Sequence, residues 1–171
     1  ILYGSASPSE AFQSSSLTVQ AVDIAGFMRN VAENAGIDDV RCVGAGADVA
    51  VLVRADEYPL EDVFSHILKN ADRYRRPGTP IVMRLDADEN TAAVSICNSG
   101  VQIAGDLIGK IFEYGVSDQK DAGASGSRGQ GLFVAKTYMA KMGGTISVCN
   151  VEEGVCFRLE LQRTRGGRVP K

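Results

Sequence analysis

The segment that most constrains the fold is a long amphipathic stretch closed at both ends by proline. Pro59 opens it, and Glu61 and Asp62 follow in what would be the first helical turn, where the helix dipole favours acidic side chains. The motif Pro77-Gly78-Thr79-Pro80 closes it, because such a run does not continue a helix. One apolar stripe recurs between them at helical spacing: Leu60, Val63, Phe64, Ile67, Leu68 and Ala71. The sequence therefore predicts a helix here with one face in a core.

The segments around this helix read as strands and shorter helices. Strand patterns occur at 39–43, 48–54, 81–86, 91–97, 144–150 and 154–161. The first two flank a Gly44-Ala45-Gly46 turn, and the others form two hairpins. Helical spacing predicts further helices at 22–35, 104–112 and 129–142. This order predicts an α+β fold, with helices on one face of a mixed, mainly antiparallel sheet.

The 171 residues suit a single domain. We expect it at residues 17–162, after a Ser-, Ala- and Gly-rich leader at 1–16 and before a basic linker at 163–171. Residues 115–128 lack an apolar period, which predicts a long loop, and such loops tend to be functional. Because the chain begins with Ile1 and its tail resembles a linker, we expect it to be part of a larger protein.

Composition excludes several classes of function. The chain has 18 basic and 21 acidic residues, and its formal charge of −3 argues against broad electrostatic binding to nucleic acid or anionic lipid. No apolar run approaches the ~20 residues of a membrane span. His66 is the single histidine, so a site that needs two, such as a His-Glu-x-x-His zinc site, is excluded.

The four cysteines are Cys42, Cys97, Cys149 and Cys156, and none shows Cys-x-x-Cys spacing. A zinc ribbon and a thioredoxin-like motif are therefore absent. Each cysteine lies in or beside an apolar stretch, and we expect small buried hydrophobes in a reducing cytosol. Cys149 and Cys156 would face each other across a hairpin, which allows a disulfide without requiring one.

Four local features carry the candidate chemistry. On the long helix, His66, Asn70, Arg73 and Tyr74 lie at i, i+4, i+7 and i+8, so they share one face. An amide beside a cation and an aromatic ring suits a hydrated Mg²⁺, a phosphate and a base, because Mg²⁺ keeps waters and takes few protein ligands. An ordinary solvated helix face is the other interpretation of this pattern.

The second feature is Cys97-Asn98-Ser99-Gly100-Val101-Gln102-Ile103, which follows a predicted strand. A glycine beside a polar residue at a strand end lets a flat ring approach the backbone, and a simple turn is the other interpretation. The third is Ile111-Phe112-Glu113-Tyr114-Gly115. Phe112 would pack beneath a loop hinged at Gly115, or simply end an apolar helix.

The fourth feature, Gly126-Ser127-Arg128-Gly129-Gln130-Gly131-Leu132, runs directly into a predicted helix. Glycines at a helix N-terminus present free backbone N–H groups and the positive end of the dipole, which suits phosphate. Arg128 adds a cation beside them. Gly-Lys-Ser/Thr is missing, so this is not a Walker A motif, and no strand precedes it as in a Rossmann fold.

In this order the four features resemble the N, G1, F and G2 boxes of the catalytic and ATP-binding domain of sensor histidine kinases, within the GHKL ATPase superfamily. The resemblance covers about residues 20–162. Its best-kept parts are Phe112-Glu113-Tyr114-Gly115-Val116-Ser117 and Gly129-Gln130-Gly131-Leu132. It implies a two-layer α/β sandwich in which ATP lies between the helices under a mobile lid at 115–128.

The resemblance also implies a role for each site residue. Asn70 would coordinate Mg²⁺, Arg73 would contact phosphate, and Tyr74 would line the adenine pocket. Asn98 would accept a hydrogen bond from the adenine amino group, and Gly100 would let the base approach. Gly129 and Gly131 would donate backbone hydrogen bonds to the phosphates, with Arg128 at the γ-phosphate. The remaining nucleotide-binding positions are His66, Ile103, Phe112 and Leu132.

Three residues depart from the family pattern. Asn98 replaces an aspartate, and the loss of charge assistance should weaken nucleotide binding by ~1 kcal/mol. Gln102 replaces the second glycine of the G1 box, which would narrow the pocket rim. His66 stands where water-activating relatives carry a glutamate base, so ATP hydrolysis is disfavoured. His66 would lie near Mg²⁺ or at the pocket edge, and we do not expect it to be the phosphoacceptor.

The resemblance implies transfer of the ATP γ-phosphoryl group to a histidine on a separate dimerisation domain, with a response regulator receiver domain as a further partner. Asn70, Arg73 and Arg128 would act by positioning and charge stabilisation. We expect a cytoplasmic domain, monomeric in isolation, that contacts neither nucleic acid nor membrane. Two alternatives stay open: a degenerate domain of the same fold that acts as a protein-interaction module, suggested by Asn98 and Gln102, and an anti-sigma-factor-type serine kinase.

Overall fold

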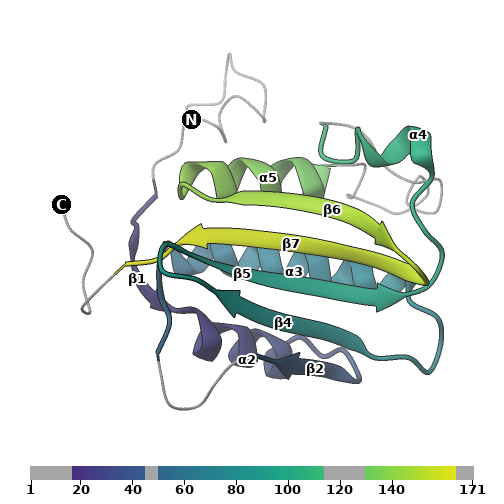
Figure 1. Ribbon diagram of the computed structural model, residues 1–171, viewed down its shortest axis with the longest axis horizontal. Helices are drawn as coiled ribbons and strands as arrows, with labels where there is room; N and C mark the ends of the chain where they lie inside the picture. The colour runs from purple at the N-terminus through teal and green to yellow at the C-terminus, as the bar shows by residue number, and fades with distance from the viewer. Residues whose placement is uncertain (1–16, 45–49, 114–129, 165–171) are drawn as a thin grey trace, which may run out of the picture.

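The computed structural model describes residues 17–44, 50–113 and 130–164. A twisted sheet forms one layer and helices α2, α3 and α5 form the other (Figure 1). None of the described helices covers the opposite face of the sheet, which we call the open face. The predicted α+β fold is confirmed. The expected leader at 1–16, the loop at 115–128 and most of the tail at 163–171 lie outside the described residues.

The main sheet has five strands in the order β2-β4-β5-β7-β6. Their bounds are β2 Val40–Val43, β4 Ile81–Ala87, β5 Thr91–Ser99, β6 Thr145–Val151 and β7 Gly154–Gln162. β2 runs parallel to β4, and every other pair is antiparallel. The two hairpins predicted from the sequence, β4–β5 and β6–β7, are confirmed. Their junction, β5 against β7, places residues about 60 positions apart side by side.

A second sheet of two strands was not predicted. It pairs β1, Gln20–Asp23, with β3, Leu52–Ala55, in antiparallel register. The predicted helix start at residue 22 is therefore wrong: α2 spans Ile24–Asn34, because the Asp23 carboxylate accepts a hydrogen bond from the Gly26 amide at 3.3 Å and caps the helix there. The strands expected on either side of Gly44 also pair with other partners rather than with each other.

Helix α3, Glu57–Tyr74, fills the space behind the sheet. It begins two residues before Pro59, since the Asp56 carboxylate accepts from the Tyr58 amide at 3.2 Å and proline is tolerated within the first turn. The predicted apolar stripe is buried throughout: Leu60, Val63, Phe64, Ile67, Leu68 and Ala71. It packs in one core with the helix-facing side chains of the sheet, among them Ile81, Met83, Ile96 and Phe157.

Two further helices lie near the ends of these strands. α4, Gly105–Ile108, is much shorter than the predicted 104–112, and turns follow it to Phe112. α5, Gln130–Lys141, lies beside α3 and buries Ala135 and Met139. The predicted helix at 129–142 is thus confirmed over its described length.

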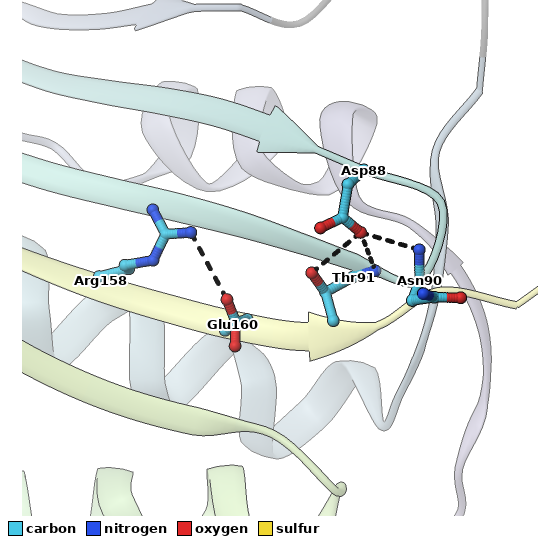
Figure 2. Close-up of polar contacts among 5 residues, drawn as sticks. All are labelled: Asp88, Asn90, Thr91, Arg158 and Glu160. Carbon is cyan, nitrogen blue, oxygen red and sulfur yellow. Dashed lines mark hydrogen bonds and ion pairs between the residues drawn. The ribbon is translucent and has the colours of Figure 1, made fainter.

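The β4–β5 hairpin is fixed by one carboxylate, shown in Figure 2. Asp88 Oδ1 accepts hydrogen bonds from the Asn90 and Thr91 amides, both at 2.8 Å, and from the Thr91 hydroxyl at 3.2 Å. These bonds stabilise the charged form and hold the pKa of Asp88 below its usual value. On the open face of β7, Arg158 and Glu160 form an exposed ion pair at 3.5 Å.

The cysteines differ from the expectation of buried thiols. Cys97 of β5 and Cys156 of β7 are direct cross-strand partners and form a disulfide, with a Cα–Cα distance of 4.1 Å. Cys149 and Cys156 do face each other across the β6–β7 hairpin, as predicted, but Cys149 is a free, exposed thiol. Cys42 is free and half-buried, and burial raises the pKa of its thiol.

Candidate functional site

The last turns of α3 present a polar face beside the core. Ile67, Leu68 and Ala71 point into the apolar interior, so the residues between them are turned away from it. Asn70 and Tyr74 are half-buried, and His66 and Arg73 are exposed. The helix extends through all four positions, so the shared face predicted from their spacing is present.

The end of β5 places a polar group inside this apolar layer. Asn98 is 5% exposed and is the only buried polar side chain among the described residues. It lies on the helix-facing side of the sheet with Ile96, between Ile81 of β4 and Val155 of β7. Its Nδ2 donates to the Ser99 carbonyl at 3.1 Å, which orients the amide. A buried amide needs hydrogen-bond partners, and the Asn98 amide lies at the edge of the apolar core.

The backbone of Gly100 packs against the end of α3. A Cβ at this position would lie 2.2 Å from the Tyr74 carbonyl oxygen, and φ is +153°. The Arg76 amide donates to the Ser99 carbonyl at 2.7 Å, and the Gly100 amide donates to Glu153 at 2.9 Å. Glycine is thus required here for the contact between β5 and α3. The close neighbour of Gly100 is thus the end of α3, whereas the sequence suggested that this glycine lets a base approach.

Residues 101–104, which we call the strap, run from β5 to α4 along the end of β6. Asn150 fixes the strap with two hydrogen bonds: the Ile103 amide donates to Oδ1 at 2.8 Å, and Nδ2 donates to the Ile103 carbonyl at 2.9 Å. Gln102 is exposed, and its Nε2 donates to the Val151 carbonyl. Sequence reasoning missed Asn150, because its partner is main chain 47 residues away and no local pattern marks it.

Phe112 connects the sheet with α5. Its ring meets that of Phe157 edge-on, with centroids 6.2 Å apart, and Lys136 Nζ lies 5.9 Å from its centroid. Phe112 is half-buried and packs against the main core. Its predicted contact with a loop at Gly115 lies outside the described residues.

The start of α5 meets the polar face of α3. The His66 ring lies directly over Gly131, since a Cβ there would be 1.5 Å from Nε2 and 1.9 Å from Cδ2. Although His66 as a whole residue is exposed, the packing of its ring over Gly131 partly desolvates the imidazole and lowers its pKa; Lys69 lowers the pKa further, and Asp62 acts in the opposite direction. The ring is therefore neutral at pH 7. Leu132 is half-buried and packs against the core, whereas Arg128 and Gly129 lie outside the described residues.

This geometry brings three of the predicted motifs to one end of the fold. Tyr74 meets Gly100, His66 meets Gly131, and both contacts lie on the same helix. Residues 55–165 match the family described as histidine kinase-, DNA gyrase B-, and HSP90-like ATPase. The chain belongs to this family. The predicted resemblance to histidine kinase ATP-binding domains is thereby confirmed.

Similar proteins agree with this assignment. The sensor histidine kinase CusS of Escherichia coli O157:H7 is 30% identical over 137 residues, covering 79% of this chain and 27% of CusS. The fold matches full-length ShkA in complex with AMPPNP at a TM-score of 0.72 and 24% identity, over 90% of this chain and 33% of ShkA. It also matches the nucleotide-free catalytic domain of histidine kinase ThkA at 0.71 and 22% identity, over 87% of this chain and all of that one.

The chain spans less than a third of the length of the curated sensor proteins that it matches. It is a histidine kinase-type ATPase domain, and it resembles the catalytic domains of such sensors. No helix among residues 17–44, 50–113 and 130–164 has the length and apolar character to cross a membrane.

Proposed function

We propose that this chain binds MgATP and transfers the γ-phosphoryl group to a histidine on a separate dimerisation domain, as the catalytic part of a two-component sensor histidine kinase. The observation that carries the proposal is the convergence on α3: Gly131 of α5 under His66, and Gly100 of β5 against Tyr74. These contacts bring together the segments that hold Asn70, Asn98 and the glycines. The AMPPNP bound to the similarly folded ShkA supports a nucleotide as the ligand.

The chain's own residues fit a nucleotide. Asn98 offers a buried amide at the edge of an apolar layer, and a base edge is a partner that would offset its desolvation. Tyr74 and Ile103, both half-buried, would contact the base on either side of this amide. Gly131 lies in the first turn of α5, where backbone N–H groups have no partner within the helix, and we expect its N–H to donate to a phosphate oxygen.

Magnesium would depend on few protein ligands. Across the described ranges, no group of three or more His, Cys, Asp or Glu side chains could hold a metal ion. The Asn70 amide oxygen would therefore contact a metal that keeps its waters and phosphate oxygens as the other ligands. Bound Mg²⁺ would neutralise charge on the triphosphate. Arg73, exposed on the same face, and Arg128 would add positive charge near the transferred group.

The partners and compartment follow from the same proposal. The phosphoacceptor histidine would be on a dimerisation domain of the same full-length kinase, since His66 lies within the helix that would bind the nucleotide. A response regulator receiver domain would take the phosphoryl group next. The domain would be cytoplasmic, and monomeric without the dimerisation domain.

Calorimetric titration with ATP, with and without Mg²⁺, tests the proposal. We expect saturable binding that requires Mg²⁺ and is lost in Asn70→Ala. Asn30→Ala is the matched control, because Asn30 is exposed on α2 and the substitution likewise removes a side-chain amide from a helix surface. Absence of binding up to millimolar ATP, from protein with an intact circular dichroism spectrum, would refute the proposal and favour a protein-interaction module of the same fold.

A further inference from the structure

Three cysteines form a row across the open face of the sheet. β7 lies between β5 and β6 (Figure 1). Its Cys156 is the direct cross-strand partner of Cys97 on one side and of Cys149 on the other. The residues that flank them in sequence, such as Ile96, Val155 and Phe157, are buried against the helices. Because side chains alternate along a strand, all three cysteines point to the opposite, open face.

The row holds one disulfide and one free thiol. Cys97 and Cys156 are bonded, whereas Cys149 is free and exposed. The central cysteine is thus already oxidised, and a reduced, solvent-accessible thiol lies on its other side. Thiol–disulfide exchange between Cys149 and the Cys97–Cys156 disulfide would need no other group from the protein.

The register makes Cys156 a direct partner of both neighbours, and the typical Cα separations of both kinds of pair can be compared with those of disulfides. In an antiparallel sheet, the amide and carbonyl of a residue both point to the same neighbouring strand. A central residue therefore forms a wider, hydrogen-bonded pair with that neighbour and a closer, non-hydrogen-bonded pair with the neighbour on its other side. Cys97 and Cys156, at 4.1 Å between Cα atoms, form the close pair. Cys149 and Cys156 are therefore the wider pair, for which a separation of about 5.5 Å is typical. That separation falls within the range that disulfides span.

We propose that this row is a thiol–disulfide exchange site in which Cys149 is the attacking thiol. The Cys149 thiolate attacks Sγ of Cys156, the Cys149–Cys156 bond forms, and the Cys97–Cys156 bond breaks. Cys97 leaves as a thiolate and takes up the proton that Cys149 gave to solvent. One disulfide and one thiol are present before and after, so the step requires neither an oxidant nor a reductant. The order of the strands puts the attacking, central and leaving sulfurs in a row, as this displacement demands.

The exchange moves a cross-link between two segments of the candidate site. Cys97 directly precedes the buried Asn98, and Cys149 directly precedes Asn150, which holds the strap. In one isomer the cross-link fixes β5 beside Asn98, and in the other it fixes β6 beside Asn150. An effect of the isomer on ATP affinity rests on the proposed function, whereas the exchange itself does not.

Peptide mapping of the wild-type chain tests the exchange without nucleotide. Protein purified without reductant is incubated at pH 8, alkylated with N-ethylmaleimide, and resolved on a non-reducing gel, so that intermolecular dimers are set aside. The monomer is then digested, and the linked peptides are identified by mass spectrometry. We expect the Cys149–Cys156 peptide to appear, with Cys97 alkylated to the same extent.

Two variants complete the test. Cys149→Ser should show only the Cys97–Cys156 peptide and no alkylated Cys97. Cys42→Ser should behave as wild type, because Cys42 lies on the helix-facing side with Met83. Recovery of Cys97–Cys156 alone in wild type, with Cys149 fully alkylated, would overturn the proposal. Because this map contains no ATP, its failure would leave the calorimetric test of nucleotide binding unaffected.

Discussion

Removal of the Asn150 side chain should release the strap. Asn150→Ala deletes two hydrogen bonds with Ile103: the 2.8 Å bond that the Ile103 amide donates to Oδ1, and the 2.9 Å bond that Nδ2 donates to the Ile103 carbonyl. A net value of about 1 kcal/mol for each bond gives about 2 kcal/mol for the pair. Since 1.36 kcal/mol corresponds to a factor of ten, the strap should open about 30-fold more often.

Hydrogen exchange measures this opening at a single amide. We expect the Ile103 amide to exchange about 30-fold faster in Asn150→Ala, while amides of α3 change little. Asn150→Asp should be no better than alanine, because it keeps the acceptor for the Ile103 amide but sets a second oxygen against the Ile103 carbonyl. Gln102→Ala is a one-bond comparison, since it deletes only the bond from the strap to the Val151 carbonyl, and it should speed exchange at Ile103 by less than Asn150→Ala does. If the Ile103 amide exchanges at the wild-type rate in Asn150→Ala, the strap is held by other contacts and this reasoning is wrong.

Four further predictions address the site and the sheet. Gly131→Ala should weaken ATP binding several-fold, because its Cβ would overlap His66 Nε2; His66→Ala in the same chain should recover part of the loss, as measured by a double-mutant cycle in calorimetry. Asn98→Asp should tighten ATP binding by about 1 kcal/mol, roughly fivefold in Kd, through charge assistance, and should lower Tm because a carboxylate is buried; unchanged affinity would contradict the proposed adenine contact. Reduction of the disulfide, which joins residues 59 positions apart, should lower the free energy of unfolding by up to about 4 kcal/mol in urea titrations. Cys42→Ser, which removes a free thiol and keeps the disulfide, should show the same loss on reduction. Because the pKa of His66 is lowered in the folded state, the folded chain binds fewer protons than the unfolded one, and the free energy of unfolding should decrease as the pH falls below the ordinary histidine pKa of about 6.5. His66→Gln should remove this part of the pH dependence.

The sequence predicted the elements whose signals are local. The stripe from Leu60 to Ala71 and the proline-bounded ends defined α3, and period-2 runs around Asp88 and Glu152 defined the hairpins. The polar positions of the site also followed from local spacing. Asn70 and Tyr74 share a face on α3, and Asn98 is the last residue but one of β5.

The rest depended on partners far apart in the sequence. β1 has four residues, too few to show a period, and it is a strand because β3 lies beside it. The strand predicted at 48–54 overlaps β3, but its pairing with β1 could not be predicted from local sequence. Cys156 has equally plausible partners in Cys149 and Cys97 until the β5–β7 register is known. The role of Asn150 needs the strap to pass along β6, and that path is set by tertiary packing.

The order of the strands also affects how the chain is synthesised. β5 is the middle strand, yet one of its two neighbours, β7, comes last in sequence among the strands of this sheet. At roughly 5–20 residues per second, the ribosome needs about 3–13 s to proceed from the end of β5 to the end of β7. During that interval the β4–β5 hairpin has an unpaired inner edge and an apolar face that includes Ile96 and Val94. A nascent chain of this fold therefore passes through an aggregation-prone stage whose length is set by the translation of α5 and β6, and slow codons in that region would prolong it.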